Sequence, residues 1–429
     1  MPAQLYAVDD KFPDVVAELE ARGWRRLPFV SCPKFDLKWT NYAKIAWKQK
    51  NQLAQLLYNQ RAQIQVDHWF PRTFDMSISE DILRLKFWFR YVEAVKILQQ
   101  SFIESMAIDE QKFQVVARDN FAASPTLGLQ LKKLSFNQDR RCEIQEILTQ
   151  LEQRDPQFLT VCRDDSNVWI CKPSNLSQGR GIVLCNTSED MEKLLFPDKN
   201  CAVNSDEIKD RSMIQTKWMV QKYIERPLLL QNGRKFDIRQ WVLITALKPD
   251  PIVFWFFKSY LRFCSRKFNL AHLHDQFVHL SNYSVQQHFA RDVEDDSRSN
   301  QDEDVNAFEP MWSSEQFQDM LRQQHGNDVW SETIVPQMQS IVQLTLDAVL
   351  PRLEVVGQGF EWLGYDFLVD ENNHVWLLEV NVSPDMSHST KITAELVPKA
   401  TADALSVILD TESSRSSENG WLPFPLRRS

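Results

Sequence analysis

Residues 364–381 read Gly364-Tyr365-Asp366-Phe367-Leu368-Val369-Asp370, then Glu371-Asn372-Asn373-His374, then Val375-Trp376-Leu377-Leu378-Glu379-Val380-Asn381. Two runs rich in apolar and aromatic residues around a short polar segment predict a β-hairpin. With a four-residue turn, Asp370 pairs with Val375, and counting back places Asp366 directly opposite Glu379. Because side chains alternate between faces along a strand, Asn381 shares the face of Glu379. The hairpin therefore brings two carboxylates and an amide oxygen together.

This arrangement needs a physical reason, because like charges directly opposite each other destabilise a β-ladder. A bound cation is the simplest reason. A small set of oxygen ligands suits Mg²⁺, which keeps water ligands and shares phosphate oxygens. We therefore predict a Mg²⁺ site on Asp366, Glu379 and Asn381. A solvated hairpin face without a metal is the alternative.

A glycine-containing loop between two predicted strands is the second candidate site. The chain has only ten glycines, and two of them, Gly179 and Gly181, lie in this loop. A strand ends in Lys172, and Arg180 lies between the two glycines. Backbone amides in such a loop can approach phosphate oxygens, and the two cations can neutralise their charge. A plain hairpin with surface cations explains the pattern equally well, and the spacing matches neither a P-loop nor a dinucleotide-binding motif.

A second long hairpin is predicted from residues 235–263. When Leu247 pairs with Ile252 across the turn, Arg262 lies opposite Asp237, Tyr260 opposite Arg239, and Lys258 opposite Trp241. One face then collects Lys235, Asp237, Arg239, Lys258, Tyr260 and Arg262. A cationic sheet face beside a carboxylate hairpin is what Mg²⁺-nucleotide chemistry requires, because phosphoryl transfer depends on positioning and charge neutralisation. A solvent-facing sheet with salt bridges is the alternative.

Length and composition indicate a folded protein of several domains. The 429 residues are 43% hydrophobic and 11% aromatic, and the length prior of ~150 residues per domain gives about three domains. The longest apolar run among the predicted strands, residues 252–257, is far shorter than the ~18 residues of a membrane span. The start lacks a basic-then-apolar signal, so we expect a soluble intracellular protein without a membrane partner.

Charge and cysteine usage exclude other classes. The net charge of -9 argues against general nucleic-acid binding. Residues 1–50 nevertheless carry nine basic and six acidic residues, so this segment could meet an acidic partner or be a solvated face. The seven scattered cysteines contain no C-x-x-C spacing, which argues against a disulfide framework or a zinc site. No nucleophile elbow or kinase catalytic loop is present.

The element pattern predicts an N-terminal α/β domain at residues 1–110, a central lobe at 111–225, a C-terminal lobe with the hairpins at 226–410, and a disordered tail at 411–429. A helix is expected over Ile82–Leu98. Ser313 and Gln316 have the spacing of a capping box at the start of another helix. The acidic segment 291–304 is expected to be a loop.

The three candidate sites, in this order, resemble the tubulin tyrosine ligase-like family of ATP-grasp ligases over residues 1 to about 410. Trp169-Ile170-Cys171-Lys172-Pro173 resembles the family's first nucleotide strand, and Gln221-Lys222-Tyr223-Ile224 resembles its adenine hinge. The resemblance implies an α+β ATP-grasp fold, also described as α/β, with ATP and Mg²⁺ between two lobes and a small N-terminal α/β domain.

The resemblance also implies roles for individual residues. The implied ATP contacts are Lys172, Gln178, Gly179, Arg180, Gly181, Ile182, Gln221, Lys222, Tyr223, Ile224, Lys235 and Asp237. The implied substrate contacts are Arg239, Arg262, His279, Ser281 and Asn282. Catalytic roles are implied for Lys172, Arg180, Arg262 and Glu379, and the implied Mg²⁺ ligands are those predicted from the hairpin, Asp366, Glu379 and Asn381.

Within the family, four segments look most like tubulin glycylases, namely Lys235–Trp241, Ser259–Phe263, Met311–Phe317 and Ser383–Thr390. The loop Gln178–Gly181 is closer to polyglutamylases. The implied reaction is ATP-dependent ligation of free glycine to glutamate γ-carboxylates in tubulin tails through an acyl phosphate. Polyglutamylation or a non-catalytic microtubule-binding role are the alternatives. We expect a monomer that acts on microtubules in the cytoplasm and cytoskeleton, and in a cilium or flagellar axoneme.

Overall fold

We analysed a computed structural model of the protein. It describes residues 3–40, 50–104, 140–158, 167–174, 176, 178–196, 217–246, 250–289, 308–352, 359–412 and 416–426. The chain folds into two compact units. The first draws on residues 1–60, 228–268 and 280–429, and the second on residues 61–227 and 269–279.

The unit boundaries can be compared with the ranges expected from the sequence. The observed boundary after Pro227 lies close to the boundary expected at residue 225. Residues 1–110 fall in both units, because the chain passes from the first to the second after Gln60. Each unit combines helices with a largely antiparallel sheet, which agrees with the expected α+β class. No described helix is long and apolar enough to cross a membrane.

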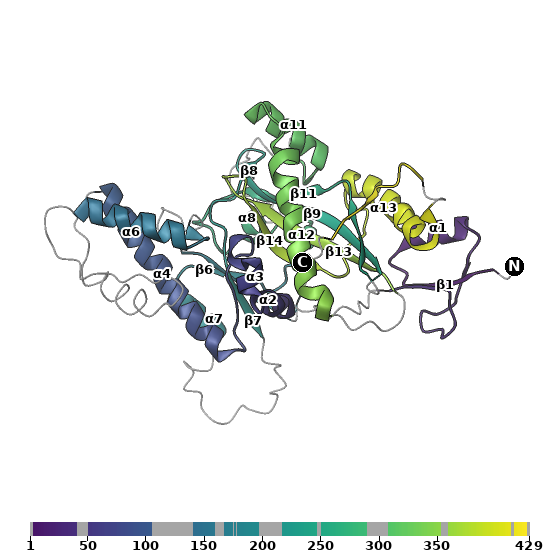
Figure 1. Cartoon of the computed structure of the whole chain (residues 1–429), viewed down its shortest axis with the longest axis horizontal. Coiled ribbons are helices and arrows are strands. Elements are labelled where there is room, and N and C mark those ends of the chain that lie inside the picture. Colours follow the sequence, from purple (N-terminus) through teal and green to yellow (C-terminus); the bar gives the residue numbers. More distant parts are fainter. Residues whose placement is uncertain are drawn as a thin grey trace, which may run out of the picture. The chain divides into compact units, whose positions relative to one another are not determined.

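The second unit is built on a four-stranded antiparallel sheet in the order β4-β7-β5-β6. Its strands are β4 (Thr73–Asp75), β5 (Trp169–Pro173), β6 (Val183–Cys185) and β7 (Trp218–Lys222). Its helices are α3 (Arg61–Ile64), the 3₁₀ helix η1 (Val66–His68), α4 (Ser79–Glu104), α6 (Arg140–Arg154), α7 (Ser188–Leu195) and α8 (Gln276–His279). Helix α4 confirms the helix expected over residues 82–98, and it lies beside α6 (Figure 1).

The alternation of side chains gives this sheet one apolar and one polar face. Trp169, Cys171 and Val220 lie in the core that α4 and α6 cover. Lys172 and Gln221 occupy the alternate positions and therefore lie on the other face. The polar face is the one available for chemistry in this unit.

The first unit contains an eight-stranded sheet around the long central strand β9 (Arg234–Ala246). Its other strands are β8 (Leu229–Leu230), β10 (Ile252–Phe256), β11 (Tyr260–Lys267), β12 (Met311–Ser313), β13 (Glu361–Val369), β14 (Val375–Asn381) and β15 (Trp421–Pro423). The helical segments are α1 (Pro13–Ala21), α2 (Lys50–Tyr58), α9 (Tyr283–Gln286), α11 (Ser314–His325), the π-helical turn η5 (Trp330–Ile334), α12 (Val335–Val349), the 3₁₀ helix η6 (Leu350–Arg352) and α13 (Lys391–Leu409). Ser313 and Gln316 form the predicted capping box of α11.

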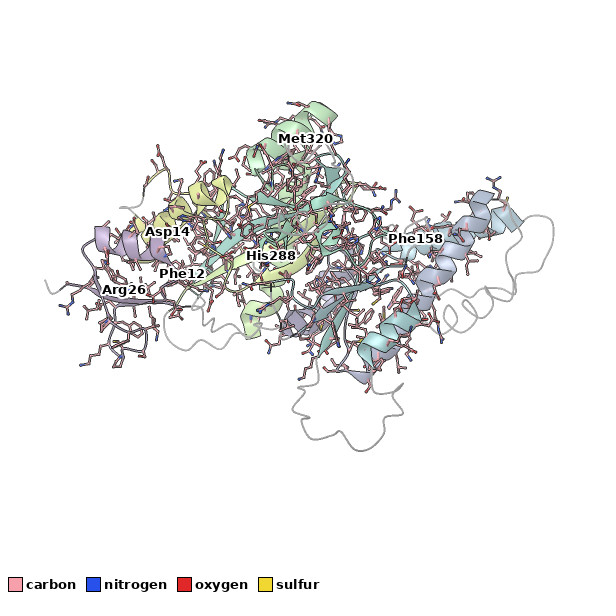
Figure 2. The ribbon with its side chains drawn as sticks, turned by 180° about the vertical axis from the view of Figure 1, so that it is seen from behind. Phe12, Asp14, Arg26, Phe158, His288 and Met320 are labelled. Atoms are coloured by element: carbon pink, nitrogen blue, oxygen red, sulfur yellow. The ribbon has the colours of Figure 1, made fainter. Side chains whose placement is uncertain are left out.

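A three-stranded parallel sheet in the order β2-β1-β3 precedes the large sheet in sequence. Its strands are β1 (Leu5–Val8), β2 (Arg25–Arg26) and β3 (Leu37–Trp39). Helix α1 packs beside α13 (Figure 1). Phe12 and Asp14 lie at the start of α1 (Figure 2), where Asp14 contacts His388 at 2.9 Å. Residues from both ends of the chain thus share one core, in which Tyr6 packs with Leu396 and Trp421.

The hairpin β13–β14 has the predicted pairing of Asp366 with Glu379, but a different turn. Val369, not Asp370, pairs with Val375, so the turn is one residue longer than expected. A β-bulge between Asp366 and Phe367 then shifts the register by one residue, because Phe367 pairs with Leu377 whereas Asp366 pairs with Glu379. The longer turn and the bulge shift the register by one residue in opposite directions. Asp366 and Glu379 therefore pair as predicted.

The second predicted hairpin is interrupted. β10 and β11 pair in succession with β9, and the buried Gln240 side chain donates to the main-chain oxygens of Trp241 and Phe256 and accepts from Ser259. The predicted pairing of Lys258 with Trp241 is therefore wrong, and Lys258 instead contacts Glu315 at 2.9 Å. Ile252 pairs with Ala246, so the predicted pairing of Leu247 with Ile252 is also wrong. Leu247 itself and the acidic segment 291–304 lie outside the described residues.

Part of the expected disordered tail is ordered. Strand β15 (Trp421–Pro423) pairs with β10, and Trp421 Nε1 donates to the main-chain oxygen of Ala400 at 2.9 Å. Lack of periodicity suggested disorder, but a three-residue edge strand is too short to show a period. The large aromatic residue Trp421 directly after Gly420 is the sequence signal that could have indicated an ordered segment.

Candidate functional site

The polar face of the large sheet is built by strand register. Arg239 pairs with Tyr260 on one side and with Asp366 on the other, and Asp366 pairs in turn with Glu379. Directly paired residues point to the same face, so these four side chains form one row across the sheet. Arg262 pairs with Asp237 as predicted and forms the neighbouring row with it.

Buried ion pairs connect the two rows. Arg239 Nε lies 2.5 Å from Asp366 Oδ1, and its Nη2 lies 3.2 Å from Oδ2. Arg262 Nε and Nη2 donate to the two oxygens of Asp237 at 2.7 and 2.6 Å, and Nη2 also lies 3.0 Å from Asp366 Oδ2. Ser281 Oγ donates to Asp237 Oδ2 at 2.7 Å. Arg262 therefore bridges the two aspartates in a geometry that fixes both carboxylates.

Electrostatics of this network depend on its burial. Burial raises the pKa of Asp366, and the nearby carboxylates of Asp237 and Glu379 add to this, against the opposing effect of the two arginines. Burial opposes the charged form of Arg262, but Asp237 and Asp366 outweigh it and hold its pKa well above the usual value. The guanidinium groups therefore stay charged and are the fixed positive groups of the face.

Asn381 connects this network to the second carboxylate of the hairpin. Its Nδ2 donates to Asp366 Oδ2 and to Glu379 Oε1, each at 3.1 Å. Asp366 is only 2% exposed, whereas Glu379 and Asn381 are half-buried. The three predicted metal ligands therefore meet at one place, with two of them accessible.

Arg239 and Arg262 neutralise part of the negative charge that the facing carboxylates would otherwise leave uncompensated. Asp366 already has two cationic partners, so the facing carboxylates do not by themselves require a metal ion. The described residues contain no group of three or more His, Cys, Asp or Glu side chains that could hold a metal. A cation at this place would use two carboxylates, the Asn381 amide oxygen and oxygens from outside the chain, which is the ligand type that Mg²⁺ accepts.

Gly364 makes room for the Arg239 side chain. It lies on β13 opposite Trp241, two residues before Asp366. A Cβ atom at this position would lie 2.9 Å from Pro384 Cβ, 3.2 Å from Arg239 Nη1 and 3.3 Å from Arg239 Cδ. The residue pattern alone does not mark Gly364 as a site residue. The missing information was the pairing of β13 with β9, which brings residues more than a hundred positions apart together.

The remaining predicted residues of the first unit lie close to the network in sequence. Lys235 is buried on β9, where it pairs with Leu229. Asn282 precedes α9, and its main-chain oxygen accepts from Val285 and Gln286. These hydrogen bonds involve the main chain of Asn282 and do not test its side chain. The substrate role of Asn282 stays a prediction.

In the second unit, Lys172 lies in a hydrogen-bonded chain of side chains. Lys172 Nζ donates to Gln221 Oε1 at 2.6 Å, and Gln221 Nε2 donates to Thr73 Oγ1 at 2.9 Å. Thr73 is buried and pairs directly with Gln221 across β4 and β7. Thr73 was not among the predicted site residues, since its strand precedes β7 by almost 150 residues.

The Lys222 side chain lies on the opposite, core face of this sheet. It is 2% exposed and pairs with Glu225, and it donates to the main-chain oxygen of Val168 at 2.9 Å. Its ammonium group also lies 5.6 Å from the centre of the Trp169 ring. A ligand on the polar face could therefore meet Lys222 only through its backbone, which is the role that the hinge resemblance implies.

Tyr223 and His279 are linked within the same unit. Tyr223 Oη lies 3.0 Å from His279 Nδ1, and His279 Nε2 lies 3.1 Å from the main-chain oxygen of His272. A carbonyl oxygen only accepts, so Nε2 carries a proton. Both ring nitrogens are thus engaged by the protein itself, which favours a structural task for His279 over the predicted substrate contact. Ile224 is buried beside this pair.

The glycine loop contains three residues with left-handed backbone conformation, two of which are glycines. Gln178, Gly179 and Gly181 have φ of 63°, 75° and 69°, in the left-handed region where glycine is favoured. A Cβ on Gly181 would lie 3.0 Å from Pro173 Cγ, so the loop packs closely on the end of β5. Arg180 is exposed at its tip, and Ile182 leads into β6.

A cavity of about 520 Å³ lies elsewhere in the first unit, between the β8–β9 turn and α11. Its lining includes Arg234, Trp312 and Met320, the last of which is labelled on α11 in Figure 2. None of the predicted site residues lines this cavity, so it is separate from the charged face.

Comparison with known proteins supplies the family. The model of the tubulin-tyrosine ligase family matches residues 97–416, which include all the predicted site residues. The chain belongs to the tubulin-tyrosine ligase family. The resemblance noted from the motifs is thereby confirmed, and it covers both the hinge strand and the carboxylate hairpin.

Several relatives carry names that describe an activity. The chain is 38% identical over 294 residues to the tubulin monoglycylase TTLL3 of Mus musculus, covering 68% of this chain and 29% of the relative. It is 36% identical over 268 residues to tubulin glycylase 3B of Tetrahymena thermophila, covering 62% and 20%. It is 34% identical over 279 residues to the protein monoglycylase TTLL8 of Mus musculus, covering 65% and 31%. The chain thus spans less than a third of the length of these relatives.

Proposed function

We propose that the chain is an ATP-dependent ligase that adds glycine to glutamate γ-carboxylates in tubulin C-terminal tails. The observation that carries the proposal is the similarity to named glycylases over about two thirds of the chain. It is supported by the Arg239–Asp366–Arg262–Asp237 network, which offers fixed charges of both signs. The fold assignment that goes with it is ATP-grasp, with ATP and Mg²⁺ as the proposed cofactors.

The residues of the second unit would bind ATP. Lys172 and Arg180 would neutralise phosphate charge, with Gln178, Gly179, Gly181 and Ile182 forming the loop around the phosphates. The hinge Gln221, Lys222, Tyr223 and Ile224 would contact adenine through backbone groups, and Lys235 and Asp237 of the first unit would contact ribose and phosphates. These groups position and neutralise a nucleotide, which is what phosphoryl transfer requires of the protein.

The residues of the carboxylate hairpin fit a Mg²⁺ ion. Asn381 Nδ2 lies 3.1 Å from both Asp366 Oδ2 and Glu379 Oε1, so the two carboxylates face one place. Turning the Asn381 amide over would bring its oxygen to that place as the third ligand. Mg²⁺ would supply neutralisation of phosphate charge there. Arg239 and Arg262 hold Asp366 in place, so the hairpin presents a preformed carboxylate.

The proposed ligation needs no nucleophile from the protein. An oxygen of the glutamate γ-carboxylate bonds to the terminal phosphorus of ATP while the bond to ADP breaks. The glycine amine then bonds to the acyl carbon, inorganic phosphate leaves, and the amine loses a proton as the isopeptide bond forms. Arg262, Arg239, Ser281 and Asn282 are the proposed substrate contacts, and Arg262 would stabilise the developing negative charge.

The test is incorporation of labelled amino acids. The purified chain is incubated with microtubules, ATP and Mg²⁺, with radiolabelled glycine, glutamate or tyrosine in separate tubes. Label from glycine alone is the expected result. Label from glutamate would instead favour the polyglutamylase alternative, to which the loop Gln178–Gly181 points. ATP binding without any incorporation would overturn the proposed acceptor, and absence of ATP binding would favour a non-catalytic microtubule-binding role.

Partners and location follow from the proposed substrate. Tubulin tails on microtubules and free glycine are the proposed substrates, and the proposed setting is the cytoskeleton, including a cilium or flagellar axoneme. We propose that the chain acts as a monomer. The net charge of -9 opposes long-range attraction to an acidic tail, so local basic groups must provide it, and microtubule binding should weaken as salt rises.

A further inference from the structure

The polar face of the β4-β7-β5 sheet contains a hydrogen-bonded chain that begins outside the predicted site. Thr73 Oγ1 donates to the main-chain oxygen of Pro71 at 2.7 Å and accepts from Gln221 Nε2 at 2.9 Å. Gln221 Oε1 in turn accepts from Lys172 Nζ at 2.6 Å. Thr73 and Gln221 are both buried, whereas Lys172 is partly exposed. The chain therefore runs from the protein interior to the ammonium group.

The direction of each hydrogen bond is fixed by chemistry. The Pro71 carbonyl can only accept, so it takes the single hydroxyl proton of Thr73. The hydroxyl oxygen can then only accept from Gln221, which must turn its amide nitrogen toward Thr73. Its amide oxygen is thereby turned toward Lys172. The reversed amide would place Nε2 against the ammonium group, where both groups donate and neither accepts. It would also place Oε1 against the hydroxyl oxygen, whose single proton is already given to Pro71.

Strand register places the three side chains in this order. Thr73 pairs directly with Gln221 across β4 and β7, and Gln221 pairs directly with Ile170 across β7 and β5. Lys172 lies two residues beyond Ile170 and therefore shares its face. The long Lys172 side chain has several rotatable bonds, so a fixed acceptor restricts where its charge can lie.

We propose that Thr73 is a positioning residue for Lys172 and acts through the Gln221 side chain. In this proposal Thr73 acts on the nucleotide only through Gln221 and Lys172. Its hydroxyl sets the orientation of the Gln221 amide, and the amide oxygen holds the ammonium group on the polar face. This inference rests on the nucleotide role proposed above for Lys172.

The experiment is a double-mutant cycle between Thr73 and Lys172, read by binding of the fluorescent nucleotide mant-ATP to the full chain. Thr73→Val keeps the shape of the side chain and removes the hydroxyl. We expect it to weaken mant-ATP binding about two- to tenfold, the range for one neutral hydrogen bond. Thr73→Ser restores the hydroxyl and should bind like the wild type. In a Lys172→Ala background, Thr73→Val should cause no further loss.

A matched control separates this role from general destabilisation. Thr149 Oγ1 also donates to a main-chain oxygen, that of Gln145 at 2.8 Å, but on the exposed surface of α6. Thr149→Val should leave mant-ATP binding unchanged. If Thr73→Val is insoluble, Thr73→Ala takes its place in the same cycle.

The outcomes separate this inference from the proposed function. Wild-type affinity in Thr73→Val, with weakened binding in Lys172→Ala, would overturn the positioning role and leave the nucleotide role of Lys172 standing. Equal losses from Thr73→Val in the presence and absence of Lys172 would also overturn it, because Thr73 would then act elsewhere. Wild-type affinity in Lys172→Ala would refute the nucleotide role itself.

Discussion

The Arg239 guanidinium group donates two hydrogen bonds to Asp366 on the neighbouring strand, Nε to Oδ1 at 2.5 Å and Nη2 to Oδ2 at 3.2 Å. Both side chains are almost completely buried. A buried charge pair contributes little net stability, but removing one partner leaves a costly uncompensated charge. The pair therefore fixes the position of Asp366, and the fold depends on keeping both members.

Asp366→Asn is expected to destabilise the protein by about 3–5 kcal/mol, because Arg239 and Arg262 would lose their shared carboxylate in the interior. Urea unfolding of the purified variant measures this loss. The control is Asp319→Asn, which removes an exposed partner of Arg322 at 3.5 Å and should change stability by less than about 1 kcal/mol. Equal stability of the two variants would show that Asp366 is not held as a charge.

Glu379→Gln should leave the fold intact and abolish ligation. Glu379 is half-buried, and the glutamine retains an oxygen that can accept from Asn381. The proposed cation needs the charge of Glu379, whereas the hydrogen bond from Asn381 does not, so labelled-glycine incorporation should fall while the urea midpoint stays unchanged. Glu371→Gln, in the turn of the same hairpin, should retain full activity. Full activity of Glu379→Gln would remove this residue from the site.

The sequence could predict pairings within a hairpin but not pairings between hairpins. Asp366 faces Glu379, and Arg262 faces Asp237, as counted from the turns. The first of these depended on two compensating features, a longer turn and a β-bulge. The second depended on a register shift along β10 and on the interruption before β11. The residue pattern shows none of these features. A bulge inserts one residue without a distinctive composition, so local counting cannot detect it.

The arginine partners of Asp366 were missed because they depend on a long-range contact. Strand β13 pairs with β9 although Asp366 follows Arg239 by 127 positions. The hairpin alone suggested two uncompensated carboxylates, and a cation seemed necessary. Once β9 is placed beside it, the guanidinium groups provide the compensation. Thr73 was missed for the same reason, since β4 joins β7 from a distant part of the chain.

Gly364→Ala should disturb the Arg239 side chain and reduce ligation. The new methyl group would lie 3.2 Å from Arg239 Nη1 and 2.9 Å from Pro384 Cβ, and overpacking of this kind costs about 1–3 kcal/mol. Gly359→Ala is the control, because a Cβ there meets nothing within 4 Å. Labelled-glycine incorporation and urea unfolding are measured for both. Unchanged activity in Gly364→Ala would mean that the position of Arg239 is not important for ligation.

Tyr223→Phe tests whether His279 is held for structure. The variant keeps the contact between the two rings, whose centroids lie 5.6 Å apart. It removes only the hydroxyl that is hydrogen-bonded to His279 Nδ1. A buried nitrogen without a partner costs about 1–3 kcal/mol, so the urea midpoint should fall. If His279 acts only through this bond, His279→Gln should add little to the loss in Tyr223→Phe. Strong additional loss of glycine incorporation, without additional loss of stability, would support the substrate role instead.

Two neighbouring residues of β15 allow a direct test of the ordered C-terminal segment. Trp421 is 3% exposed and packs on Phe256 and Trp362, whereas Leu422 is 49% exposed. Trp421→Ala should destabilise the protein by about 3–5 kcal/mol, the range for a buried aromatic residue, and Leu422→Ala should have a small effect because its side chain faces solvent. Urea unfolding measures both variants. Similar midpoints would mean that the segment does not pack on the sheet in solution. A selective loss in Trp421→Ala would show that the last strand closes the aromatic core that Trp421 shares with Phe256 and Trp362.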